Sequence, residues 1–325
     1  MVNENTTNNR PSGEERRERE RLIETIRERA TTIEHLSELR VCADIVNDLT
    51  GAIRTLAPYE ERPKITIFGS ARLRHTSPSY TEITKLAAAL AEDGYVVVTG
   101  GGPGIMTAGL EGAGNGNAVG VAIRLPFETP AFHLDIPVVR QEHFPTRKLS
   151  MIRHVRGFVA APGGIGTLDE IAEVLTLLQT GHKQPTPVVL LDDGTGLWAG
   201  FEALMQHMAA RELVDEADHS LYHIASSWQE VHHHIRRFWA RYQGCQGAPG
   251  ALVLRLNSPV DAIEAAKLAE QYPDLEPLPH PEGLRCGFDG KSYGRLRQLI
   301  DTINEKAAET GYAPADDGRM HKLGT

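Results

Sequence analysis

The feature that most constrains the fold is a regular alternation, from Lys64 to Tyr242, between continuous apolar runs and segments with helical periodicity. Apolar runs without polar alternation are typical of parallel strands that helices cover on both faces. The sequence therefore predicts an α/β fold, a Rossmann-like doubly wound parallel sheet. We expect strands at 64–70, 95–100, 118–123, 136–140, 157–162 and 187–193, and helices at 80–93, 105–114, 147–154, 168–179, 198–211 and 227–242.

The segments that flank this core differ from it in pattern. We expect residues 1–13 to be a polar, disordered tail, and residues 14–58 to be a helical extension of one or two amphipathic helices. The Rossmann-like domain then spans 59–243, and a glycine-rich linker follows to Gly250. Residues 250–325 are expected to form a small C-terminal α/β appendage.

Charge and cysteine content bound the class of protein. The chain has 34 Lys and Arg against 43 Asp and Glu, a net charge of −9, which disfavours nucleic acid and anionic membranes as partners. Its start lacks the apolar core of a signal peptide, and no apolar run reaches the length of a membrane span. The three cysteines Cys42, Cys245 and Cys286 are far apart and odd in number. These features predict a cytoplasmic protein.

Three glycine-rich turns follow predicted strands, at 68–72, 99–106 and 162–167. Ligands of open parallel sheets bind at the carboxyl ends of strands, where helix N-termini offer free N–H groups and a positive dipole end. Three such turns together indicate a phosphate-bearing ligand. The expected contact residues of the first two turns are Gly69, Ser70, Gly101, Gly102 and Gly104.

Common nucleotide and metal sites do not match. None of the turns has the GxxxxGK[ST] spacing of a P-loop, and Arg124 stands where an NAD-binding strand wants an acidic residue. Thr107 replaces the third glycine of an NADP loop. The consecutive histidines 232–234 point in different directions on a helix, so we expect them to be solvated, and Asp192 and Asp193 to form a polar turn. The sequence therefore predicts neither a cofactor nor a metal.

Two segments each allow two interpretations. Thr167 and Glu170 have the spacing of a capping box, in which Thr167 caps a helix and Glu170 returns a hydrogen bond. Alternatively, Glu170 faces the ligand crevice, where a carboxylate can stabilise positive charge or activate water. Arg147 and Lys148 are either surface cations or a clamp on a phosphate or sugar oxygen.

The sequences TGGGPGIM at 99–106, Arg147-Lys148-x-x-Met151, and PGGIGTLDE at 162–170 resemble the LONELY GUY family, the cytokinin-activating phosphoribohydrolases. The likeness covers about 64–211. It implies that the Rossmann-like domain is a nucleotide-binding catalytic domain that hydrolyses the N-glycosidic bond of a nucleoside 5'-monophosphate, AMP or N6-modified AMP. The products are the free base and ribose 5-phosphate. The resemblance also implies a homodimer or larger assembly.

The resemblance assigns roles to individual residues. Arg147 and Glu170 match the family's catalytic pair, and its nucleotide contacts match Lys148, Gly163, Gly164, Ile165, Gly166, Thr167, Leu168, Asp169 and Thr176. For Thr176 a hydrogen bond back to the preceding helical turn is the alternative. Arg156-Gly157 departs from the family's acidic and small pair. The terminal extensions resemble the extended bacterial branch of the family.

Two other functions compete with hydrolysis. The name lysine decarboxylase, often given to family members, requires a pyridoxal phosphate lysine with a partner for the pyridine nitrogen, and neither stands out. A non-catalytic carrier of a phosphorylated ligand, such as a nucleotide or the molybdenum cofactor, also uses glycine-rich turns. A carrier has no need of the Arg147 and Glu170 pair, so this pair distinguishes the two.

Overall fold

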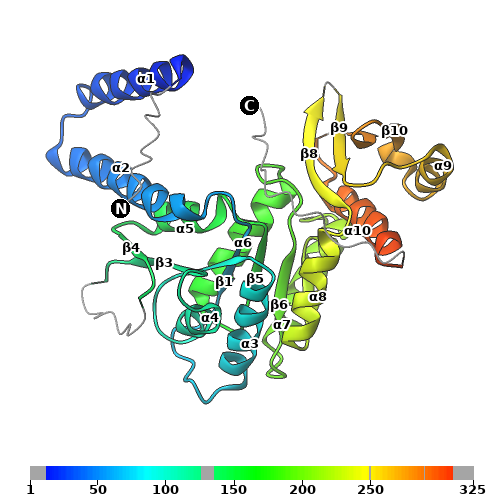
Figure 1. Cartoon of the computed structure of the whole chain (residues 1–325), viewed down its shortest axis with the longest axis horizontal. Coiled ribbons are helices and arrows are strands. Elements are labelled where there is room, and N and C mark those ends of the chain that lie inside the picture. Colours follow the sequence, from blue (N-terminus) through cyan, green and yellow to red (C-terminus); the bar gives the residue numbers. More distant parts are fainter. Residues whose placement is uncertain (1–11, 126–134, 249, 289, 310–325) are drawn as a thin grey trace, which may run out of the picture.

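The computed structural model describes residues 12–125, 135–248, 250–288 and 290–309. Its centre is a seven-stranded sheet in the order β4-β3-β2-β1-β5-β6-β7, in which neighbouring strands run parallel (Figure 1). The predicted doubly wound α/β fold is confirmed. The strands are β1 (Lys64–Phe68), β2 (Val96–Thr99), β3 (Ala118–Ile123), β4 (Val138–Gln141), β5 (Gly157–Ala160), β6 (Val188–Leu191) and β7 (His223–Ala225).

The strand order places a topological switch point between β1 and β5. From β1 the chain moves outward through β2 and β3 to β4, then returns to β5 on the other side of β1 and continues to β7. Crevices at such points bind the ligands of open parallel sheets. Strand β7 was not predicted, because its three residues are too few to show a pattern.

Helices cover both faces of this sheet, and each face has its own apolar cluster. One cluster packs α3, α4 and α8 against the sheet, and the other packs α5, α6 and α7 against the opposite face. The helices are α3 (Pro78–Glu92), α4 (Ile105–Ala113), α5 (Phe144–Ile152), α6 (Ile165–Gln179), α7 (Leu197–Ala210) and α8 (Trp228–Phe238). Helices α5 and α6 each begin three residues earlier than predicted, and this matters for the site.

A second sheet of four antiparallel strands follows, in the order β10-β11-β9-β8. The linker expected at 243–250 is wrong, because most of it is the edge strand β8, whose backbone pairs with β9. A bulge between Tyr242 and Gly244 accommodates the glycine that suggested a linker. The remaining elements are β8 (Tyr242–Ala248), β9 (Ala251–Leu256), β10 (Leu278–His280), β11 (Gly283–Gly287), α9 (Ala262–Gln271), α10 (Tyr293–Glu309) and the short 3₁₀ helices η1 (Ala57–Tyr59), η2 (Glu216–Leu221) and η3 (Pro273–Leu275). The domain boundary itself remains a prediction.

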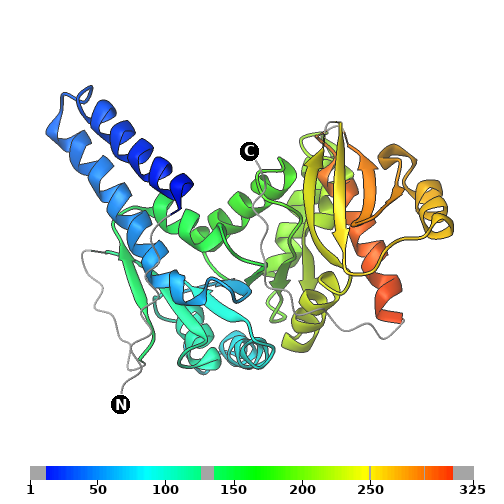
Figure 2. The same cartoon turned by 45° about the horizontal axis from the view of Figure 1, so that its top comes forward.

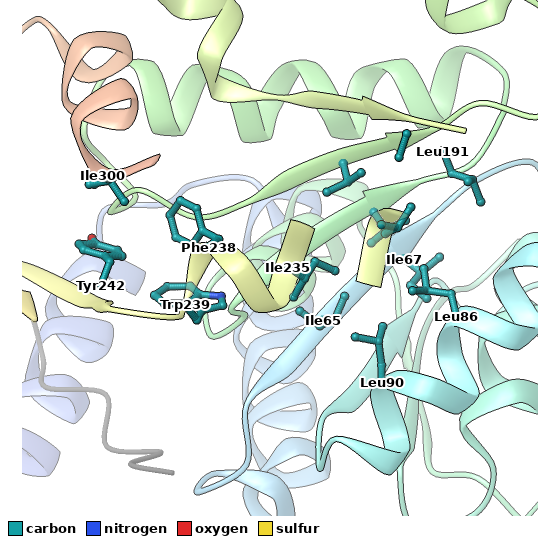
Figure 3. Packing of buried hydrophobic residues seen from close by; sticks show 14 of the residues in the cluster. Ile65, Ile67, Leu86, Leu90, Leu191, Ile235, Phe238, Trp239, Tyr242 and Ile300 are labelled. Atoms are coloured by element: carbon teal, nitrogen blue, oxygen red, sulfur yellow. The ribbon is translucent and has the colours of Figure 1, made fainter. Parts of the chain in front are cut away.

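One apolar cluster joins the two sheets. Figure 3 shows Ile235, Phe238 and Tyr242 between Ile65 of the parallel sheet and Ile300 of α10. The packing makes one expectation wrong. His234 is buried rather than solvated, because α8 is covered by α10, and its Nε2 lies 3.2 Å from Nη2 of Arg297.

The N-terminal extension consists of α1 (Gly13–Ala30) and α2 (Leu36–Leu56), which project from the body as an arm (Figure 2). Helix α1 buries none of its side chains, whereas the second half of α2 contributes the buried Asp48 and Ala52. Of the expected tail, residues 1–11 lie outside the described residues, and Ser12 caps α1. Within the described part of the chain, no helix combines the length and apolarity that crossing a membrane requires.

The shared cluster predicts that the two sheets unfold together. Leu254 on β9 is fully buried, so Leu254→Ala should lower the free energy of unfolding by about 2 to 5 kcal/mol. Ile263→Ala on α9 is the control: its side chain is 70% exposed, and the change should stay within about 0.5 kcal/mol. Chemical denaturation followed by circular dichroism measures both. A separate early transition of the second sheet would contradict a shared core.

Candidate functional site

The three glycine-rich turns meet at the carboxyl ends of β1, β2 and β5, which are neighbours in the sheet. Ser70 connects them: its N–H donates to the Pro162 carbonyl at 3.2 Å, and its own carbonyl accepts from the N–H of Ile105 at 3.0 Å. The structure therefore brings together the turns that the sequence predicted to share a ligand.

Close packing explains several of the glycines. Gly104 has a φ of +68°, and a Cβ there would lie 2.3 Å from the Ser70 carbonyl oxygen. A Cβ on Gly69 would lie 2.5 Å from the Cγ2 of Ile105. Gly101, with a φ of +61°, is buried, and Gly102 is partly exposed. The first two turns thus hold each other in place.

The third turn presents an open helix N-terminus. Gly164 is the N-cap of α6, no side chain caps it, and a Cβ at Gly164 or Gly166 would meet no atom within 4 Å. Helical geometry leaves the first N–H groups of α6 without acceptors inside the helix. Ile165 is 86% exposed at this end. This is an accessible site for an anion such as a phosphate.

The position of the N-cap decides between the two interpretations of Glu170. A capping box requires Thr167 at the N-cap, but Thr167 is the third residue of α6 and is buried. A Cβ on Gly163 would lie 2.1 Å from the Thr167 Oγ1, so this side chain packs against the turn. The capping-box interpretation is therefore wrong. Glu170 lies one turn further into the helix and accepts a hydrogen bond from Arg147 Nη1 at 3.2 Å.

Backbone carbonyls fix the guanidinium of Arg147. Its side chain, on α5, is almost fully buried; Nε donates to the Val121 carbonyl at 2.9 Å and Nη2 to the Gly100 carbonyl at 3.3 Å. A Cβ on Gly100 would lie 1.9 Å from Nη2, so a side chain there would displace the guanidinium from this position. Sequence reasoning missed Gly100 although it stands in the second turn. The Val121 carbonyl carries no sequence signal, because every residue has one.

The surroundings of Glu170 change its acidity. Burial raises the pKa of Glu170 to about 7, while the nearby positive charges of Arg147 and Lys148 act to lower it. The side chain is 12% exposed. A carboxyl group with a pKa near neutrality can exchange a proton with a reacting group under physiological conditions.

Lys148 is held by two carboxylates. Its Nζ lies 2.7 Å from Asp169 Oδ1 and 2.9 Å from Glu173 Oε2. Burial acts to lower the pKa of Lys148, but hydrogen bonds to these two carboxylates outweigh burial and raise the pKa. Glu173 was not predicted. Lys148 stands next to the Arg147–Glu170 pair, and a bound phosphate would compete with the carboxylates for it.

Two further predicted contact residues lie differently. Thr176 is exposed about 9 Å along α6 from Glu170, and its Oγ1 donates to the Ala172 carbonyl at 2.8 Å. The helical back-bond that was the alternative for Thr176 is present. Leu168 is exposed on the first turn of α6. In the described part of the chain, no three His, Cys, Asp or Glu side chains are grouped to hold a metal ion.

Known proteins match the part of the chain that builds this site. A protein-family model described as "Possible lysine decarboxylase" matches residues 104–235. A probable cytokinin riboside 5'-monophosphate phosphoribohydrolase of Oryza sativa subsp. japonica is 29% identical over 179 residues, which are 51% of this chain and 74% of that protein. The molybdenum cofactor carrier protein of Chlamydomonas reinhardtii superposes with a TM-score of 0.39 at 24% identity, covering 53% of this chain and 94% of that one.

A bacterial relative has a higher identity. The cytokinin riboside 5'-monophosphate phosphoribohydrolase of Mycobacterium marinum is 32% identical over 142 residues, which are 41% of this chain and 74% of that protein. The site at the glycine-rich turns and the similarity over 74% of this relative's length point to the same family. The chain belongs to the LONELY GUY family of cytokinin riboside 5'-monophosphate phosphoribohydrolases.

Proposed function

We propose that the chain is a phosphoribohydrolase that hydrolyses the N-glycosidic bond of a nucleoside 5'-monophosphate, AMP or N6-modified AMP. The observation that carries this proposal is the buried Arg147–Glu170 pair beside the open N-terminus of α6. Family membership supports the same chemistry. A lysine decarboxylase needs a lysine that can form a Schiff base with pyridoxal phosphate, and Lys148, the lysine beside the pair, is engaged by two carboxylates.

The 5'-phosphate binds at the N-terminus of α6 in this proposal. The free N–H groups after Gly164 and the positive end of the helix dipole suit a phosphate. Lys148 adds a positive charge beside them once it exchanges a carboxylate for a phosphate oxygen. The ribose then lies over the turn that leads to Glu170.

Bond cleavage follows from the charge that develops on the ribose. As the bond between C1' and the base nitrogen lengthens, the sugar becomes cationic, and the Glu170 carboxylate stabilises it and accepts a proton from the attacking water. The base leaves with the bonding electron pair and takes up the proton that Glu170 received from water, so Glu170 is regenerated and water and the nucleotide yield the free base and ribose 5-phosphate. Arg147 keeps the carboxylate in position through the 3.2 Å hydrogen bond.

The proposal includes the assembly and the compartment. Four apolar side chains around the site are exposed, Phe144 and Leu149 on α5 and Ile165 and Leu168 on α6, so we propose a homodimer or larger assembly through these helices. The three cysteines are free thiols and Cys42 is exposed, which suits a reducing cytoplasm.

The direct test is incubation of purified protein with AMP, CMP, GMP and N6-modified AMP, followed by chromatography for free base. We expect base from AMP or its N6-modified form. No base from any nucleotide would overturn the proposal. Mass spectrometry of a ligand co-purified with such an inactive protein would then favour the carrier of a phosphorylated ligand.

Glu170→Gln should lower the turnover of AMP by roughly 100-fold or more, because an amide neither stabilises a developing cation nor accepts a proton. Nucleotide affinity, measured by calorimetry, should change little. Glu270→Gln, an exposed carboxylate on α9, is the matched control and should leave turnover unchanged. Equal turnover by Glu170→Gln and the wild type would remove Glu170 from the mechanism.

The raised pKa of Glu170 also predicts a pH-dependent stability. The folded protein holds this proton up to a pKa of about 7, against an ordinary value of 4.5, so the stabilisation is complete below pH 4.5 and is lost as pH rises through 7. The glutamine of Glu170→Gln does not titrate, so this variant loses no stability at that site as the pH rises. Its free energy of unfolding relative to wild type should rise by about 3 kcal/mol from pH 4.5 to pH 8. Denaturation at a series of pH values measures it, and a constant difference would refute the shift.

The proposed assembly predicts a solution mass of at least two chains of 35.7 kDa. Ile165→Asp and Leu149→Asp should lower that mass, because each places a charge in the buried centre of an interface. Light scattering at micromolar concentration measures it, with Leu204→Asp on α7 as a control at an exposed apolar residue outside α5 and α6. A single-chain mass for the wild type would contradict the assembly.

A further inference from the structure

Helix α5, which carries Arg147 and Lys148, has no cap from its own segment. Its N-cap is His143, whose side chain makes no capping hydrogen bond. An acceptor for the residues that lead into α5, and for the Thr146 hydroxyl in its first turn, comes from the N-terminal arm.

Asp48 of α2 supplies it. Its carboxylate accepts from the N–H of Glu142 at 3.0 Å, from the N–H of His143 at 3.1 Å and from Thr146 Oγ1 at 2.6 Å. Its backbone carbonyl accepts from Gln141 Nε2 at 3.1 Å. Asp48 is only 4% exposed. A buried carboxylate with three donors is fixed in place, and its charge suits the positive end of α5.

The other end of α5 is fixed by Lys183, whose side chain is partly buried. Lys183 Nζ donates to the carbonyls of Ile152 at 3.1 Å and Val155 at 3.2 Å, and Thr66 Oγ1 donates to the Met151 carbonyl at 2.7 Å. Opposite charges from distant segments thus hold the two ends of a nine-residue helix. Thr146, which donates to Asp48, directly precedes Arg147. The hydrogen bonds of Asp48 therefore end next to the residue that meets Glu170.

We propose that Asp48 is a positioning residue of the active site: by anchoring the start of α5 from the N-terminal extension, it sets where the Arg147 guanidinium meets Glu170. The extension is then part of the scaffold of the site. This inference rests on the proposed function for its kinetic readout. Its structural readout, the ionisation of Glu170, does not depend on that function.

Glu170 reports on the position of Arg147 because few charges face it. These are Arg147 and Lys148 from α5 and Asp169 from its own helix. If α5 shifts and the guanidinium moves away, the ionised form of Glu170 loses its partner, and its pKa rises further. Asp48 itself is close to His143, which also lies 3.9 Å from Asp44.

The experiment compares Asp48→Asn and Asp48→Ala with Asp44→Asn. Asp44 lies one turn earlier on α2 and is partly exposed, and Asp44→Asn removes the same charge while leaving every hydrogen bond of the Asp48 carboxylate in place. Carboxyl-carbon NMR of labelled glutamate, assigned with Glu170→Gln, gives the pKa of Glu170 in each full-length protein. We expect the pKa to rise by about half a unit or more in the Asp48 variants and to stay unchanged in Asp44→Asn.

Kinetics supply the second readout. In the Asp48 variants we expect kcat for AMP to fall roughly tenfold and KM to change by less than about threefold. The acidic limb of the pH profile of kcat should move to higher pH. Asp44→Asn should match the wild type. If Asp48→Ala does not fold, Asp48→Asn keeps the shape of the side chain, and Thr146→Val removes one of the three donors to the Asp48 carboxylate.

The outcomes separate the two proposals. Asp48 variants that melt at lower temperature but keep the wild-type pKa of Glu170 would show a merely structural role and overturn the positioning role. A wild type that releases no base overturns the proposed function, while the NMR titration still decides on Asp48. A pKa of Glu170 that rises equally in Asp44→Asn would also overturn the positioning role. The effect would then come from the lost charge rather than from the hydrogen bonds of Asp48.

Discussion

The site depends on one buried cation. The guanidinium of Arg147 is in contact with a carbonyl after β2, a carbonyl of β3 and the carboxylate of Glu170 on α6. A buried charge is strongly destabilising unless it is paired and hydrogen-bonded, so these three segments have to be assembled together. The same contacts explain why Gly100 has no side chain and why Glu170 points inward. The sheet, the turn and the helix thus each provide a hydrogen-bond acceptor for the same side chain.

The segments outside the Rossmann-like core contribute to this arrangement. Asp48 joins the N-terminal arm to α5, and the apolar cluster through Phe238 joins the second sheet to the parallel sheet. Helix α1, by contrast, buries nothing in the described part of the chain. The extension therefore has two halves with different roles: the half of α2 near the core holds the helix that carries Arg147, and α1 only extends from it.

Most of the parallel sheet could be predicted, because its strands are continuous apolar runs buried on both faces. Predictions failed where local composition and tertiary contacts disagree. The glycines of 243–250 suggest a linker, yet pairing with β9 makes a strand of them. Polarity suggests that His234 is solvated, yet α10 covers it and Arg297 meets it. In each case the missing information is a partner distant in sequence.

The sequence by itself determined the fold class and the three glycine-rich turns, because strand burial and tight turns are local properties. The resemblance to the LONELY GUY family added Arg147 and Glu170 as a candidate pair. Only the tertiary structure decided what Glu170 contacts. The spacing from Thr167 fits a capping box equally well, but α6 begins at Ile165, and Arg147 approaches from a helix 23 residues earlier. A cap and an ion pair compete for one carboxylate, and packing of α5 against the sheet, not the motif, selects the ion pair.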